Sequence, residues 1–265
     1  MTIFAIEYYR DMKRFIKYFA VALLLMLSSC GIFSRTSKAT YRKLIPSEIR
    51  GVKEQIIERK GYILSYNCDT RLPNWVFWHL TQERANGDAV RPGNAYHEDT
   101  KVPRPRATNA DYRRSGFTRG HMCPAGDNKW NRTAMYDTFA YSNICPQTER
   151  CNSGVWNSIE MMCREWAREY DDIYIVSGPI VNKKHDTIGS NAVAVPDAFF
   201  KVVVCMNGTK RGIGFICDNS ERKQTMKQCV VTIEEIERVT GIDFFPNLSS
   251  RDRRLIEERA NLKDW

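Results

Sequence analysis

The chain has 265 residues, with 40 Lys or Arg against 31 Asp or Glu and a formal net charge of +9. The stretch after position 45, about 220 residues, is long enough for one well-packed domain, and it contains no repeat or linker, which excludes repeat and multi-domain architectures. A basic excess suits a polyanionic partner but does not by itself identify one.

The N-terminus has the pattern of a targeting segment. Lys13, Arg14 and Lys17 are followed by the apolar run 18–27, which suits the hydrophobic region of a signal peptide and is too short to span a bilayer. The run ends in Leu-Ser-Ser-Cys-Gly, which resembles a bacterial lipoprotein cleavage site with Cys30 as the lipid-bearing residue.

We therefore expect residues 1–30 to be a lipoprotein-type signal, 31–45 a polar tether and 46–265 a single domain. This predicts an exported protein that is held on a bacterial envelope membrane through lipid on Cys30. If Cys30 is not lipidated, the segment is an ordinary cleaved signal and the protein is periplasmic or secreted. Translation from Met12 is compatible with the same pattern.

Apolar patterning predicts the elements in chain order. Residues 62–66 and 75–80 are rich in β-branched and aromatic side chains and predict a hairpin. Residues 84–111 predict a long surface loop, and 131–141 a helix. A longer helix, capped by Asn152 or Ser153, is expected to run to about Tyr170.

The C-terminal half continues with a buried strand over 173–178 and a hairpin of 199–205 with 213–217 around Asn207-Gly208. Thr232 opens a capping box for a helix that stops at Gly241, and 251–263 predict a last amphipathic helix. Strands and helices interleave irregularly, which predicts an α+β fold.

The cysteines suggest disulfides. Without Cys30, eight of the nine remain, and an even count in an exported chain favours pairing. Cys205 with Cys229 is the pair we expect, since both border strands of one half. The alternative is a zinc site made of His121 and three cysteines, although no paired C-x₂-C spacing supports it. Those three cysteines are Cys123, Cys145 and Cys151.

The residues best suited to catalysis are in the segment Arg119-Gly120-His121, which is followed downstream by Asn152 and Glu160. On an extended strand Arg119 and His121 share a face, so a cation and a titratable imidazole can address one target. Asn152 and Glu160 are eight residues apart, roughly on one helix face. A base, a cation, an oxygen ligand and a carboxylate are the groups needed for metal-assisted phosphodiester cleavage.

These motifs closely resemble the DNA/RNA non-specific endonuclease family, the ββα-metal or His-Me finger nucleases, which include endonuclease G. The family signature is Asp-Arg-Gly-His, then Asn-x-x-Pro-Gln, then Asn-x-Gly-x-Trp-x-x-x-Glu. The sequence matches all three in order, except that Thr118 replaces the opening acidic residue. The resemblance implies an α+β fold with a central, mostly antiparallel sheet, helices on both sides and a ββα-metal finger active site.

The resemblance also implies roles. His121 is the general base, although a lone histidine is commonly a core residue. Arg119 binds the phosphate at or next to the cleaved bond, and Arg91 stands where the family has a second phosphate-binding arginine. Arg113, Arg114, Lys129 and Arg132 flank the motif and are either part of a backbone-binding track or solvated charges.

Asn152 is the expected ligand of one Mg²⁺ ion, for which Mn²⁺ is a substitute, unless its side chain caps the helix. Glu160 is expected to hold a metal-bound water, with a solvated helix glutamate as the alternative. Asn143 lines the same pocket in the family and is assigned to the catalytic set, with a structural role in the turn as the alternative.

The predicted function is a Mg²⁺-dependent, sugar-non-specific endonuclease that hydrolyses DNA and RNA and contacts their backbone. Phosphate contacts carry no base information, and the sequence shows no motif that reads bases. Two alternatives remain: a phosphodiesterase for another phosphate ester, and a lipid-anchored nucleic-acid-binding protein in which Thr118 marks a decayed site.

Overall fold

The computed structural model describes residues 41–93 and 95–265, of which Leu44–Trp265 form one compact unit. The expected signal segment, its lipid-bearing Cys30 and most of the expected tether lie outside the described residues. Among the described helices, none has the length and apolar character needed to cross a bilayer.

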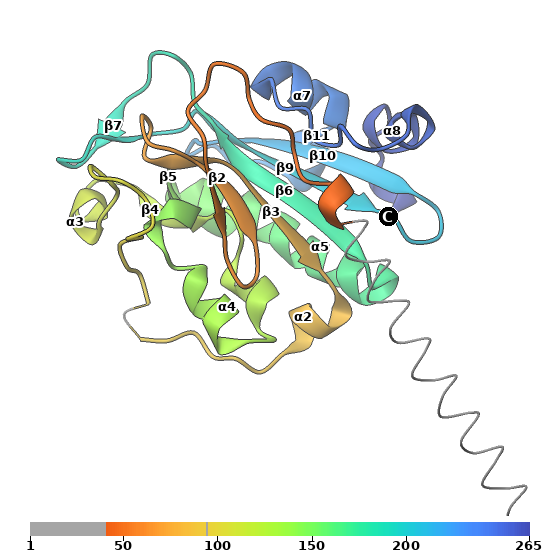
Figure 1. Ribbon diagram of the computed structural model, residues 1–265, viewed down its shortest axis with the longest axis horizontal. Coiled ribbons are helices and arrows are strands. Elements are labelled where there is room, and N and C mark those ends of the chain that lie inside the picture. The colour runs from red at the N-terminus through yellow and green to blue at the C-terminus, as the bar shows by residue number, and fades with distance from the viewer. Residues whose placement is uncertain (1–40, 94) are drawn as a thin grey trace, which may run out of the picture. The chain divides into compact units, whose positions relative to one another are not determined.

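A seven-stranded sheet forms the centre of this unit, and every adjacent pair of its strands is antiparallel (Figure 1). The strands, in their order across the sheet, are β1 (Gln55–Glu58), β2 (Ile63–Asn67), β3 (Leu72–Leu80), β6 (Ile173–Ile180), β9 (Ala198–Cys205), β10 (Arg211–Asp218) and β11 (Val230–Val231). Both predicted hairpins, β2–β3 and β9–β10, are present.

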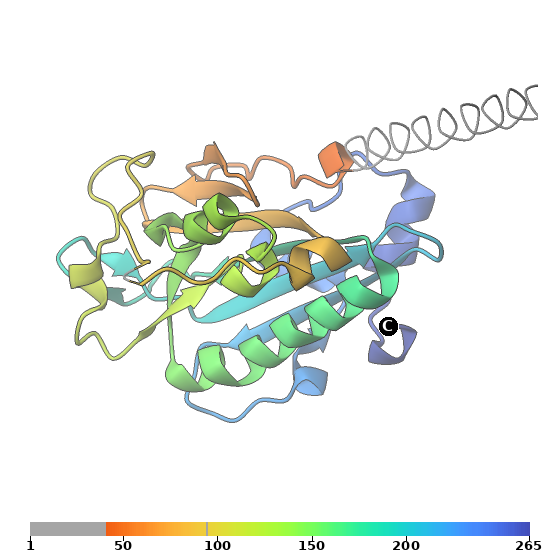
Figure 2. The same ribbon diagram turned by 90° about the horizontal axis from the view of Figure 1, so that it is seen from below.

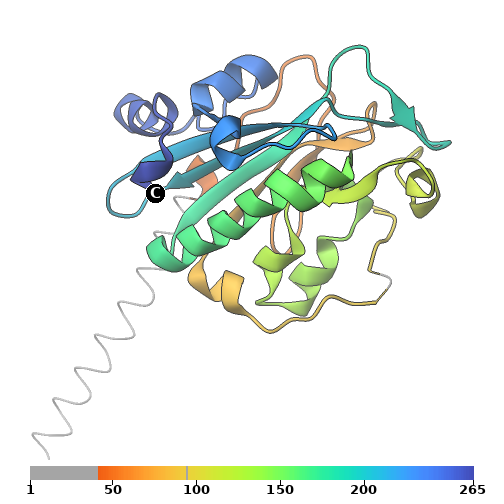
Figure 3. The ribbon, with the colours of Figure 1, turned by 180° about the vertical axis from the view of Figure 1, so that it is seen from behind.

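Helices cover both faces of the sheet. Helix α5 (Asn157–Tyr170) crosses one face, where Trp166 stacks on Phe215 of β10 (Figure 3). Helices α7 (Ile233–Thr240) and α8 (Ser250–Glu257) pack on the other face. A Cβ on Gly212 of β10 would collide with the main chain of Ile256, so this glycine allows α8 its close approach. The predicted α+β architecture is confirmed.

A separate two-stranded hairpin, β4 (Thr118–His121) with β5 (Ile144–Gln147), lies beside the α5 face (Figure 2). After β5 the chain enters the wide helical turn η3 (Cys151–Trp156), which is kinked at Gly154 (φ −96°, ψ −110°) and leads into α5. Two strands followed by a helix are the arrangement expected of a ββα finger.

Shorter elements complete the unit. They are α2 (Gln82–Asn86), α3 (Asn109–Tyr112), the 3₁₀ turn η1 (Ala125–Asn128), α4 (Arg132–Asp137), the 3₁₀ turn η2 (Tyr141–Asn143), the β7–β8 ribbon (Thr187–Ile188 with Val193–Ala194), α6 (Met226–Cys229) and the 3₁₀ turn η4 (Leu262–Asp264).

Three helix predictions differ from the structure at their ends. The helix expected over 131–141 ends at Asp137, and the one expected over 251–263 ends at Glu257. Neither Asn152 nor Ser153 is an N-cap, because helical backbone already begins at Cys151. The predicted cap at Thr232 and the stop at Gly241 are confirmed: the Thr232 side chain accepts from Glu235 N, and Gly241 is left-handed with φ 73°.

The predicted cysteine pairing is wrong. All eight cysteines after Cys30 are free thiols. Cys205 lies opposite Arg211 at one end of the β9–β10 hairpin, whereas Val230, next to Cys229, lies opposite Phe215 well along β10. The alternative zinc cluster also fails, since no group of His, Cys, Asp or Glu in the described part of the chain is arranged to hold a metal.

Candidate active site

Strand β4 presents Arg119 and His121 on one face, as the sequence predicts. Both side chains meet the ring of Tyr96: the Arg119 guanidinium carbon lies 5.4 Å from its centroid, and the imidazole centroid lies 5.7 Å away. A permanent cation and an imidazole therefore share one aromatic support. Gly120, between them, has no room for a side chain, because a Cβ there would collide with the Gln147 carboxamide of β5.

The imidazole of His121 is packed against aromatic rings, with Phe139 edge-on at 5.0 Å. Burial, and secondarily the positive charge of Arg91, lower the pKa of His121 to about 3. Its Nε2 has no hydrogen-bond partner among the described groups. The side chain is thus held neutral, which is the protonation state a general base needs.

Arg119 is aimed by two groups that the sequence motifs do not contain. Its Nε donates to the Tyr141 hydroxyl at 3.1 Å, and its Nη2 donates to Asn109 Oδ1 at 2.5 Å. The Tyr141 hydroxyl also donates to Asn109 Oδ1 at 3.1 Å. The Arg119 guanidinium is therefore fixed through two of its N–H donors, and its remaining donors are available for an anion.

Arg91 lies in the same neighbourhood as predicted. Its guanidinium carbon is 5.4 Å from the Tyr96 centroid and 4.8 Å from the Phe139 centroid. The segment that carries it is anchored at His97, whose N donates to Phe139 O and whose carbonyl accepts from Tyr141 N. Arg91 itself is exposed, so it can reach a ligand above the ring.

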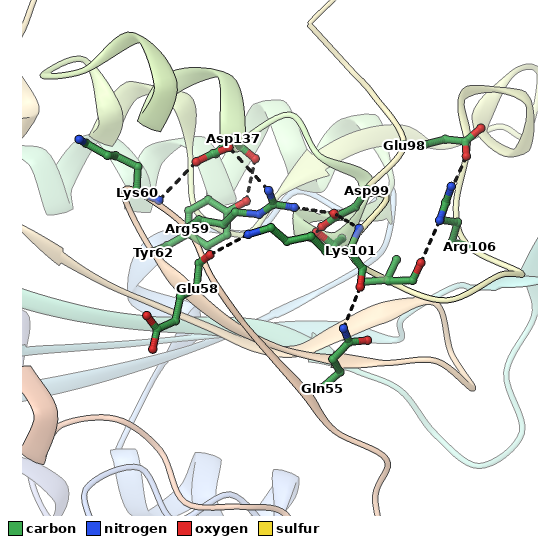
Figure 4. Close-up of polar contacts among 12 residues, drawn as sticks. Gln55, Glu58, Arg59, Lys60, Tyr62, Glu98, Asp99, Lys101, Arg106 and Asp137 are labelled. Atoms are coloured by element: carbon green, nitrogen blue, oxygen red, sulfur yellow. Dashed lines mark hydrogen bonds and ion pairs between the residues drawn. The ribbon is translucent and has the colours of Figure 1, made fainter.

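A buried ion network fixes the same loop to the sheet (Figure 4). The Arg59 guanidinium pairs with Asp99 at 2.5 Å and with Asp137 at 3.8 Å, and Ser142 Oγ donates to Asp99 at 2.5 Å. Burial alone would raise the pKa of Asp99, but the bonds from Arg59 and Ser142 outweigh it and lower that pKa. The loop, α4 and the turn before β5 are thereby joined.

Thr118, the departure from the family signature, orients the predicted metal ligand. Its hydroxyl accepts from Asn152 Nδ2 at 2.9 Å and donates to Gln147 O at 3.0 Å. The amide nitrogen of Asn152 is therefore fixed, while its Oδ1 makes no hydrogen bond to a described residue. A carbonyl oxygen held in place and left open is suited to bind a cation.

Asn152 and Glu160 lie on either side of a break in the helical backbone of η3. In a uniform α-helix, residues eight apart are about 80° out of line. Gly154, between them, has non-helical backbone angles (φ −96°, ψ −110°), so the chain does not turn uniformly from Asn152 to Glu160. Burial raises the pKa of Glu160 to about 7, and Lys201 and Arg164 oppose the rise. No contact joins Glu160 directly to Asn152 or His121 in the described structure.

Asn143 is fully buried, and all its amide groups are used on the main chain. Its Oδ1 accepts from Cys123 N at 2.9 Å, and its Nδ2 donates to Cys123 O at 2.9 Å and to Thr138 O at 2.8 Å. These bonds favour the structural alternative over a place in the catalytic set. The four flanking basic residues, Arg113, Arg114, Lys129 and Arg132, are exposed.

Comparison with known proteins bears on the family resemblance of the motifs. The sequence profile described as DNA/RNA non-specific endonuclease matches residues 44–251, most of the chain. The chain belongs to the DNA/RNA non-specific endonuclease family. It is accordingly a nuclease, and the family resemblance seen in the motifs is confirmed.

Named relatives within this endonuclease family are numerous. The chain is 33% identical to the mitochondrial nuclease EXOG of Mus musculus over 93% of its own length and 77% of the relative's. It is 37% identical to mitochondrial endonuclease G of Homo sapiens, over 74% of the chain and 71% of the relative. A solved structure of the EndoG/EndoGI complex matches with a TM-score of 0.72 at 29% identity, covering 78% of this chain and 92% of that one.

The expected localisation on a bacterial envelope is contradicted. The relatives that match, EXOG of Mus musculus, endonuclease G of Homo sapiens and the nuclease of Saccharomyces cerevisiae, are named as mitochondrial nucleases. Anchoring through lipid on Cys30 has no support among these members of the endonuclease family either. The targeting pattern at the N-terminus misled because a short basic and apolar leader is a weak signal of compartment.

Motif reading missed three residues of the site, Tyr96, Asn109 and Tyr141. Tyr96 and Asn109 meet Arg119 through the folding of the 84–112 segment over β4, and Tyr141 meets it from the turn η2 directly before β5. For Tyr96 and Asn109 the sequence held only a faint signal, namely polar and aromatic side chains in a loop too long to be a simple connection.

Proposed function

We propose that the chain hydrolyses phosphodiester bonds of both DNA and RNA with His121 as general base and one bound divalent metal ion. The observation that carries the proposal is a neutral imidazole beside a permanent cation on β4, both resting on Tyr96. A substrate phosphate would add negative charge there and raise the pKa of His121 toward the working range of a base.

The residues fit a hard cation such as Mg²⁺, with Mn²⁺ as a substitute. Asn152 would hold the ion through Oδ1, and Glu160 would orient its hydration shell from one turn beyond Trp156. Few protein oxygens are needed, because Mg²⁺ keeps several waters and accepts substrate phosphate oxygens. When bound, the ion stabilises the negative charge that develops on the phosphate.

The chain's own groups complete the chemistry. His121 takes the proton of the attacking water, and Arg119 binds the phosphate with the donors that Tyr141 and Asn109 leave unused. Arg91 holds a neighbouring phosphate. These contacts are to the backbone, so we propose that the enzyme does not discriminate among bases. We place the nuclease domain at residues 46–265.

The bond between Thr118 and Asn152 speaks against a decayed site. A threonine hydroxyl performs the task of an acceptor for the Asn152 amide, so loss of the usual acidic residue does not leave that ligand unsupported.

The test is digestion of supercoiled plasmid and of a structured RNA by the full chain with Mg²⁺, with and without chelator. We expect cleavage of both polymers, its loss with chelator, and its loss in His121→Ala. The matched control is His185→Ala; among the described residues, the imidazole of His185 bonds to the nearby Asn182 carbonyl alone. Wild-type cutting by His121→Ala would contradict the proposed base. Binding without cutting, or cleavage of small diesters alone, would favour the alternatives.

A further inference from the structure

A single lysine lies in the core beneath the site. Lys201 is the fourth residue of β9 and is 1% exposed. It pairs with Ser177 of β6 and Phe215 of β10, so it is on the face of the sheet that α5 covers. Its Nζ has no hydrogen-bond partner among the described groups. A buried ammonium without partners is costly and calls for a reason.

Two indole rings flank this ammonium. Nζ lies 4.2 Å from the ring centroid of Trp156 and 5.1 Å from that of Trp78, both within cation–π range. A cation over an indole face draws electron density from the ring and strengthens its N–H as a donor. Lys201 therefore strengthens the hydrogen bonds that these two indole N–H groups donate.

The acceptors of these two indole N–H groups are next to or part of the candidate active site. Trp156 Nε1 donates to the His121 carbonyl at 3.1 Å, and Trp78 Nε1 donates to Asp127 at 3.0 Å. Asp127 is in turn paired with Arg164 at 3.0 Å. The main chain of His121 is thus fixed from beneath by an indole that rests on Lys201.

Glu160 is the second residue of the site that Lys201 influences. It follows Trp156 by four residues, so the two side chains are on the same side of the helix. The charge of Lys201 opposes the effect of burial on the pKa of Glu160. One buried cation thus contacts the indole that supports the His121 main chain and also influences the carboxyl group of Glu160.

We propose that Lys201 is a positioning residue of the active site: it holds Trp156 against the His121 carbonyl, and through Trp156 it holds the helical turn that carries Glu160. This inference rests on the proposed function. Lys201 touches neither substrate nor the reacting atoms.

The test compares Lys201→Met, which keeps length and removes charge, with Lys201→Arg, which keeps the charge. The matched control is Val203→Ala, a buried change two residues along the same face of β9. Replacing a buried, unpaired charge by an apolar side chain tends to leave stability unchanged or raise it. Lys201→Met is therefore expected to fold, and its melting temperature verifies this.

Three readouts separate positioning from structure. Binding of Mn²⁺ to the substrate-free protein, followed by electron paramagnetic resonance, is expected to weaken roughly 10- to 100-fold in Lys201→Met. With Mg²⁺ and plasmid, kcat is expected to fall by a similar factor while KM for DNA stays unchanged. The Trp156 indole N–H resonance, assigned through Trp156→Phe, is expected to move upfield, since its hydrogen bond weakens. Lys201→Arg retains all three properties more closely than Lys201→Met.

Several outcomes overturn the inference. One is a folded Lys201→Met with wild-type Mn²⁺ affinity and an unmoved indole resonance. Another is a loss of kcat no larger than that of Val203→Ala at equal loss of melting temperature. If Lys201→Met does not fold, the test rests on Lys201→Arg. A folded Lys201→Arg with a displaced indole resonance and weakened Mn²⁺ binding would contradict the proposed role of the charge. The indole readout needs no cleavage, so it decides the role of Lys201 even if the protein proves not to cut nucleic acid.

Discussion

Thr118→Val tests whether the threonine of the first motif orients the metal ligand. The substitution keeps the side chain's shape and removes the hydroxyl that accepts from Asn152 and donates to Gln147 O. Each lost hydrogen bond contributes about 0.5–1.5 kcal/mol, so the free energy of unfolding should fall by about 1–3 kcal/mol. That loss leaves a folded protein, in which Asn152 is free to rotate.

The functional effect should exceed the structural one. With its amide unanchored, Asn152 no longer presents Oδ1 in a fixed direction, and the Mg²⁺ concentration that gives half-maximal activity should rise about 10- to 100-fold. The assay is plasmid cleavage over a Mg²⁺ series, with urea unfolding of each variant beside it. Thr118→Ser keeps the hydroxyl and is the matched control. Thr118→Asp restores an acceptor for Asn152 and should recover most of the metal affinity. A Thr118→Val enzyme with wild-type Mg²⁺ dependence would refute the orienting role.

Three further outcomes are expected from equilibrium unfolding combined with activity per folded molecule. Asn143→Ala should lower the free energy of unfolding by about 1–3 kcal/mol, since it leaves the buried N–H and carbonyl of Cys123 without their hydrogen-bond partner. A large loss of kcat at unchanged stability would instead place Asn143 in the catalytic set. Arg59→Met should cost about 3–5 kcal/mol because Asp99 is left buried and unpaired, and normal stability would show the network to be dispensable. Burial raises the pKa of Glu237 to about 7 in the folded protein. Its protonated carboxyl therefore contributes fully to the free energy of unfolding below the pKa that Glu237 has in the unfolded chain, and this contribution is lost as pH rises through 7. Glu237→Gln should remove roughly 1–3 kcal/mol of this decline in unfolding free energy between about pH 5 and pH 8, and an unaltered pH slope would count against the assignment.

The main elements and the motif positions could be predicted from local patterns. The apolar alternation before Leu80 and the Asn207-Gly208 turn specify the two hairpins, and Thr232 with Gly241 bounds α7, because these signals act within a few residues. Arg119 and His121 share a face for the same reason. The family match over residues 44–251 then extends these local predictions to the whole fold.

The remaining features depend on contacts between distant segments. The link between Arg119 and Asn109 and that between Lys201 and Trp156 arise only when the sheet, the loop and the helix assemble. The lysine did leave one trace, as a lone charge in the apolar run of β9. The even number of cysteines misled because it says nothing about distance: Cys205 ends β9, whereas Cys229 ends α6, next to the residue that pairs with Phe215 in β10.

The wide turn at Cys151–Trp156 makes this active site sensitive to the number of residues as well as to their identity. Deleting Ser153, an exposed residue, would let the segment wind as an ordinary α-helix, leaving α5 and the core intact. Asn152 and Glu160 would then be seven residues apart, which in an α-helix is only about 20° short of two full turns, so their side chains would lie on one face. A single-codon deletion at the surface would thus keep the two side chains in register, whereas one residue inserted between Trp156 and Glu160 would rotate Glu160 by about 100° relative to Asn152 with no ligand side chain altered.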